Sequence, residues 1–157
     1  MLTKIRKHDS YLNFVVEQLD LQFNDKTFLK DFYSKPIAWC SLVDLTDAGT
    51  LLKHLYSSNP RGRKPRNPCD MLRSLMLMHH QKITIVDQWV FTLKTTPIFA
   101  ILSGFSPDDV PGVGTFYDFF NRLWLASTPH LSQKKKRKLK KPRKKGKKNQ
   151  KLELKKT

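Results

Sequence analysis

Hydrophobic residues recur every three or four positions over most of the first 125 residues of the chain, which is the spacing of an α-helix rather than of a strand. The first expected helix places its apolar side chains on one face, made by Tyr11, Leu12, Val15, Val16 and Leu19. No stretch of useful length alternates apolar with polar residues, and no segment repeats another. The pattern therefore predicts an all-α fold.

Two more helices are expected before residue 57. One carries Phe28, Leu29, Phe32 and Tyr33 and should close at Pro36, because proline interrupts a helix. The other carries Leu51, Leu52, Leu55 and Tyr56. The sequence that follows, SSNPRGRKPRNP, is rich in Pro, Gly, Arg and Asn, which predicts an exposed connector.

A helix with clear boundary signals follows this connector. Asn67 is a suitable N-cap, Pro68 fits the first helical position, and Asp70 in the first turn suits the helix dipole. The next residues, CDMLRSLMLMHHQ, are apolar around most of the helix circumference, so this helix is expected at the buried centre of the domain.

Three shorter helices are expected between residues 84 and 125. The spacing of Thr84 with Asp87, and of Thr115 with Asp118, is that of a capping box, and Thr96-Pro97 opens a helix that ends near Gly104. The residues SPDDVPGVG form a second connector before the last helix. The expected apolar stripe of that helix consists of Phe116, Phe119, Phe120, Leu123 and Trp124.

Short helices joined in this way are typical of a helix-turn-helix or one of its variants. The polar side of the last helix would then present Thr115, Tyr117, Asn121 and Arg122 to DNA. Asn and Arg are suited to bidentate hydrogen bonds with adenine and guanine. The same pattern is equally consistent with a polar face that only meets water.

Positive charge concentrates at the end of the chain. The 157 residues carry a formal net charge of +17. Residues 1–130 contain 15 Lys and Arg against 12 Asp and Glu, whereas residues 131–157 contain 15 against one. This second segment predicts a disordered basic tail or linker that binds polyanions in a salt-sensitive, sequence-insensitive way. Its expected DNA-binding residues are Lys134, Lys135, Lys136, Arg137, Lys138, Lys140, Lys141, Arg143, Lys144 and Lys145.

The connector contributes a second basic group, formed by Arg61, Arg63, Lys64 and Arg66. A basic arm of this kind can follow a phosphate backbone or enter a minor groove. Basic surface loops that are simply solvated are also common, and this reading stays open.

The sequence contains no recognisable catalytic motif, and we expect no cofactor and no metal site. Cys40 and Cys69 lack a nearby second ligand, so we expect two ordinary reduced cysteines. The start of the chain does not resemble a signal peptide, and its apolar runs are too short to cross a bilayer. These features predict a cytoplasmic protein with no membrane partner.

The segment RGRKPRNPCDMLRSLMLMHHQ and the residues up to position 125 resemble the N-terminal domain of bacterial insertion-sequence transposases of the IS5/IS1182-like group. The matching pieces occur in the family's order: Arg61 to Pro65, Met71 to Leu77, Leu102 to Gly104, Pro107 to Asp109, and Thr115 to Leu123. The resemblance implies recognition of the terminal inverted repeats of an insertion sequence by this domain, with the chain associated with the nucleoid. It also implies a C-terminal ribonuclease-H-like domain with an Asp-Asp-Glu triad, which no residue here matches. We therefore expect a truncated or split transposase, with no enzymatic activity in this chain.

The expected organisation has three parts: an N-terminal helical segment at 1–60, the DNA-binding domain at 61–126, and the basic tail or linker at 127–157. The expected partner is double-stranded DNA, with a second copy or a full-length transposase as further possibilities. One alternative is a non-specific basic RNA- or ribosome-associated protein, although RNA modules usually display aromatics on an open sheet. Another is a fragment that pairs with a full-length transposase and inhibits it.

Overall fold

The structure is a computed structural model that describes residues 5–56 and 64–127, with side chains described as far as residue 124. Over these residues the chain is all-α, as predicted, and contains no strand. The helices are α1 (His8–Gln22), α2 (Lys26–Leu42), α3 (Thr46–Leu52) with a 3₁₀ turn at Lys53–Leu55, α4 (Pro68–His80), α5 (Val86–Thr95), α6 (Pro97–Ser103) and α7 (Val113–Ser127).

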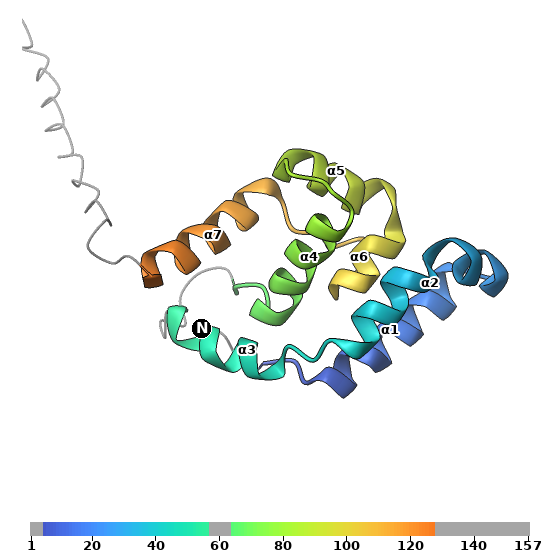
Figure 1. The fold of residues 1–157 in the computed structure, drawn as a ribbon, viewed down its shortest axis with the longest axis horizontal. Coiled ribbons are helices and arrows are strands. Elements are labelled where there is room, and N and C mark those ends of the chain that lie inside the picture. The colour runs from blue at the N-terminus through green and yellow to red at the C-terminus, as the bar shows by residue number, and fades with distance from the viewer. Residues whose placement is uncertain (1–4, 57–63, 128–157) are drawn as a thin grey trace, which may run out of the picture.

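The short helix α6 is the most completely buried element. Every residue from Ile98 to Ser103 is buried, and α6 packs against α1, α2, α4 and α5. Figure 1 shows α4 in the middle of the molecule, with α7 towards one end and α1 and α2 towards the other. The predicted central helix α4 therefore shares the centre of the fold with α6.

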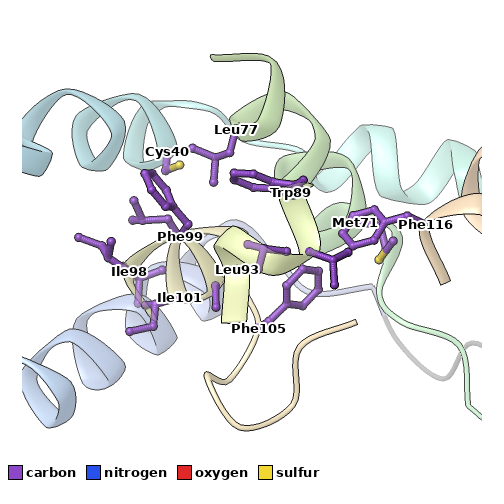
Figure 2. Packing of buried hydrophobic residues seen from close by; sticks show 14 of the residues in the cluster. Cys40, Met71, Leu77, Trp89, Leu93, Ile98, Phe99, Ile101, Phe105 and Phe116 are labelled. Atoms are coloured by element: carbon purple, nitrogen blue, oxygen red, sulfur yellow. The ribbon is translucent and has the colours of Figure 1, made fainter. Parts of the chain in front are cut away.

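One hydrophobic cluster connects these helices. Figure 2 shows it extending from Cys40 and Ile98 at one end to Met71 and Phe116 at the other, with Trp89 between them. Side chains from both sides of residue 60 contribute to this cluster. Trp89 is fully buried, and its Nε1 donates a hydrogen bond of 2.9 Å to Ser74 Oγ.

Two helix boundaries agree with the sequence prediction. Asn67 Oδ1 accepts a hydrogen bond of 3.0 Å from the backbone N–H of Cys69, and Pro68 occupies the first turn of α4. Helix α6 begins at Pro97 and is terminated by Gly104, whose φ of 95° lies in the left-handed region. Glycine reaches that region without the steric cost that a side chain would bring.

The prediction that a helix ends at Pro36 is wrong. Helix α2 continues through Pro36 to Leu42. Leu29, Pro36 and Cys40 are buried, and their spacing of seven and four residues places them on one helix face. Packing of this face against the core outweighs the backbone hydrogen bond that proline cannot donate.

The two predicted capping boxes are not formed. Helix α5 begins at Val86 with Ile85 at the N-cap and no side-chain cap, so Thr84 lies outside it. Helix α7 begins at Val113, two residues before Thr115, which places Asp118 beyond its first turn.

Several residues predicted on apolar faces are instead exposed, namely Val16, Phe28, Phe32, Leu51 and Trp124.

Asp70 has a role that the sequence did not indicate. It lies in the first turn of α4 but is buried, with Arg6 Nη1 3.2 Å from Oδ2 and Arg73 Nη1 3.6 Å from Oδ1. Arg6 Nη1 also donates a 2.9 Å hydrogen bond to the carbonyl of Gly104, and the guanidinium of Arg73 lies 3.5 Å from the centre of the Tyr11 ring. This buried cluster joins the segment before α1 to α4 and to the end of α6.

The helix-turn-helix expectation is not confirmed. A single residue, Thr96, separates α5 from α6, whereas residues 104–112 separate α6 from α7. A helix-turn-helix usually has a turn of three or four residues.

None of the helices in the described part of the chain has the length and apolar character needed to span a membrane.

Candidate nucleic-acid interface

A polar cleft of about 210 Å³ lies between the segment preceding α4 and one side of α7. It brings together four residues that the sequence assigned to DNA binding: Lys64 and Arg66 from the connector, and Thr115 and Arg122 from α7. The complete lining consists of Tyr56, Lys64, Pro65, Arg66, Met71, Thr115, Asp118, Phe119 and Arg122. Two regions of the sequence about 50 residues apart thus meet at one surface.

Helix α7 is fixed by its aromatic core face. Phe116 and Phe119 are 0% and 1% exposed, whereas Phe120 and Leu123 are only partly buried. The two phenylalanines are three residues apart and therefore lie on the same side of the helix. Their burial determines which of the remaining residues of α7 face the cleft and which face solvent.

Polar residues flank this core face of α7 on two sides. Thr115, Asp118 and Arg122 follow one another at intervals of three and four residues and line the cleft. Tyr117 and Asn121, four residues apart, are exposed on a different side, and Tyr117 is 50% exposed. The residues predicted to face DNA from the last helix are therefore divided between a cleft and an open face.

Arg122 is held against an aromatic ring at the edge of the cleft. Its guanidinium carbon lies 4.9 Å from the centre of the Tyr56 ring, which is within the range of a cation–π interaction. Burial raises the pKa of Tyr56, and the positive charge of Arg122 partly opposes this rise. Tyr56 is therefore neutral at physiological pH.

Arg66 is already engaged in an ion pair. Its Nη1 lies 2.6 Å from Asp109 Oδ2, and its Nη2 donates to Asp109 Oδ1, so the contact is bidentate. This pair attaches the segment before α4 to the loop between α6 and α7. Lys64, in contrast, is exposed at the rim of the cleft.

Sequence reasoning missed two residues of this cleft. The hydrophobic pattern predicts Tyr56 on the apolar face of the third expected helix, and no sequence pattern connects it with Arg122. The spacing from Thr115 predicts a capping role for Asp118, but this exposed residue lines the cleft together with the basic residues. Only the tertiary packing of the 3₁₀ turn against α7 brings these residues together.

The remaining predicted DNA-binding residues lie outside the described residues. These are Arg61 and Arg63 in the connector, and Lys134, Lys135, Lys136, Arg137, Lys138, Lys140, Lys141, Arg143, Lys144 and Lys145 in the tail.

The two cysteines are free, and both are buried. Burial raises the pKa of the Cys40 thiol to about 11 and also raises that of Cys69, which disfavours the reactive thiolate form. Among residues 5–56 and 64–127, no group of three or more His, Cys, Asp or Glu side chains is arranged to hold a metal ion.

Comparison with known proteins identifies the family. The family model "Transposase domain (DUF772)" matches residues 34–122, more than half of the chain. Neither the curated proteins nor the solved structures include a match to this sequence. The matched segment runs from within α2 to Arg122, and so contains α3 to α6, most of α7 and every residue that lines the cleft. The chain therefore belongs to the DUF772 transposase-domain family.

Proposed function

We propose that this chain is the DNA-binding N-terminal portion of a transposase and that it recognises the terminal inverted repeats of an insertion sequence. The observation that carries the proposal is the arrangement of α7. This helix presents an open polar face with Tyr117 and Asn121 beside a cleft that holds Lys64 and Arg122. Membership of a transposase family supports a role in DNA transposition.

The two sides of α7 suit different parts of a DNA duplex. Asn121 is exposed, and an asparagine amide can form two hydrogen bonds with the edge of adenine. Lys64 and Arg122 carry the positive charge that phosphates attract. An α-helix fits the major groove of B-form DNA, so one element can contact bases while its flank contacts the backbone.

In this proposal the chain contributes site recognition to transposition, and the catalytic chemistry belongs to the ribonuclease-H-like domain of the resembled transposases. Arg61, Arg63 and the basic residues of the tail would add affinity for DNA without sequence preference. A DNA-bound role would place the protein at the bacterial nucleoid. Pairing with a second copy or with a full-length transposase remains a prediction.

The test is a fluorescence-anisotropy titration of the full chain at about 150 mM salt. It compares a terminal-repeat duplex, a shuffled duplex of equal length and composition, and an RNA hairpin of equal charge. The proposal predicts tightest binding to the terminal repeat, by a factor on the order of 10³ or more if the site resembles other specific complexes. Equal binding to both duplexes would contradict recognition, and preference for the hairpin would favour a basic RNA-associated protein.

A further inference from the structure

We propose that the cleft between Lys64 and α7 binds a single phosphodiester group of the DNA backbone, with Lys64 and Arg122 as the cations and Thr115 as a neutral hydrogen-bond donor. This inference rests on the proposed function, because it assigns one backbone contact of the same interface. We also infer that the carboxylate of Asp118 weakens the binding of anions in the cleft.

The cleft has a suitable size and lining for such a group. Its volume of about 210 Å³ is several times the share of one water molecule in the liquid, which is about 30 Å³. Buried Met71 and Phe119 contribute to its lining, while Lys64 and Asp118 are exposed. Next to this buried apolar part of the lining the local dielectric constant is lower, so the charges there act more strongly on a bound anion than they would in water.

The structure distinguishes the three cations of the cleft. Arg66 is paired with Asp109 through two hydrogen bonds, so much of its charge is already neutralised. Arg122 is held by the Tyr56 ring, a contact to a π face rather than to an anion. Because that contact limits the motion of the side chain without cancelling its charge, Arg122 is prepared for binding a phosphate.

Asp118 explains why the cleft should favour a phosphodiester over free phosphate. It lies three residues after Thr115 and four before Arg122, on the same side of α7. A carboxylate there repels a dianion more strongly than the single charge of a backbone diester. In DNA, the contacts made by the rest of the interface offset this repulsion.

The experiment measures the salt dependence of binding to the terminal-repeat duplex for the full chain and its variants. Loss of one phosphate contact makes the negative slope of log K against log salt shallower by about 0.9. Because Lys64 and Arg122 contact the same phosphodiester, we expect each of Lys64→Gln and Arg122→Gln to lose part of this contribution, and the two together to lose no more than about 0.9. Arg122→Lys should recover the slope. Lys64 lies outside the helices, so its variant tests the site without disturbing a helix.

The matched controls lie on α2, at the opposite end of the molecule from α7 in Figure 1. Lys30 and Asp31 are both exposed, so Lys30→Gln and Asp31→Asn make the same charge changes away from the cleft. Asp118→Asn should raise DNA affinity by roughly 1.5- to 5-fold, the size of an exposed charge–charge effect. Asp31→Asn should raise it less.

The outcomes separate this site from the proposed function. If the wild-type chain prefers the terminal repeat but Lys64→Gln and Arg122→Gln keep its full salt slope, the phosphate site is wrong and the proposed function stands. The same conclusion holds if either variant behaves like Lys30→Gln. If the wild-type chain shows no preference for the terminal repeat, the proposed function fails first.

Discussion

The hydrogen bond between Trp89 and Ser74 provides a quantitative test of the core. Both residues are 0% exposed, and the indole Nε1 donates to Ser74 Oγ over 2.9 Å. In Ser74→Ala the indole N–H loses its acceptor in a place that water does not reach. A buried donor left without a partner costs about 1–3 kcal/mol, and the higher helix propensity of alanine recovers only about 0.5 kcal/mol. We therefore expect a substantial fall in the free energy of unfolding.

Ser103→Ala is the matched control. Ser103 is also 0% exposed and helical, but its hydroxyl donates to the carbonyl of Phe99 in the preceding turn. Removing that hydroxyl leaves no buried donor unpaired, so the variant should lose less than about 1 kcal/mol. Urea unfolding followed by circular dichroism gives both free energies, and thermal unfolding should show a shift of about 2–4 °C for each kcal/mol. Equal losses in the two variants would refute the reasoning.

Three further predictions concern other parts of the core. Gly104→Ala should destabilise the protein strongly, because a Cβ would lie 2.5 Å from Asp70 Oδ1 and the backbone φ is 95°; urea unfolding measures the loss. Burial raises the pKa of Asp70 to about 7 against about 3.9 in an unfolded chain, so the native state binds more protons between these values. Stability should therefore fall as the pH rises from about 4 to 7, and Asp70→Asn should flatten this dependence in unfolding curves taken across that range. Phe116→Ala should cost about 3–5 kcal/mol and Phe120→Ala clearly less, because only Phe116 is fully buried; equal losses by urea unfolding would contradict this order.

Local signals in the sequence predicted the features that depend on neighbouring residues. Helix α4 starts where the Asn67 side chain caps a backbone N–H and Pro68 fixes its own φ angle. Helix α6 ends at Gly104, which can adopt a left-handed backbone conformation. These effects act within one turn of helix, so the sequence alone identifies them.

Features that depend on tertiary packing were not predictable in this way. The continuation of α2 through Pro36 results from the burial of a face that includes Cys40. Asp70 resembles an ordinary first-turn acid until the fold brings Arg6 to it from 64 residues away. The hydrophobic pattern also overestimated how much of α7 is buried, because the core covers Phe116 and Phe119 but leaves Trp124 62% exposed.

The same limit applies to the candidate interface. The sequence predicted Lys64, Arg66 and Arg122 as DNA-binding residues. It did not indicate the ion pair of Arg66 with Asp109 or the cation–π contact of Arg122 with Tyr56. Charge and residue type are properties of single positions. Which of these cations has a partner depends on contacts between residues that lie 43 or more positions apart in the sequence.

The central claim is that α7 reads DNA sequence through its open face, and Asn121→Ala tests it most directly. The measurement is the ratio of affinities for the terminal-repeat and shuffled duplexes, with helicity followed by circular dichroism. Asn13→Ala on α1, another exposed helical asparagine, is the control. Loss of a bidentate base contact of about 1–3 kcal/mol should reduce the ratio roughly 5- to 150-fold in Asn121→Ala and leave it unchanged in the control. An unchanged ratio in a folded Asn121→Ala protein would contradict the account.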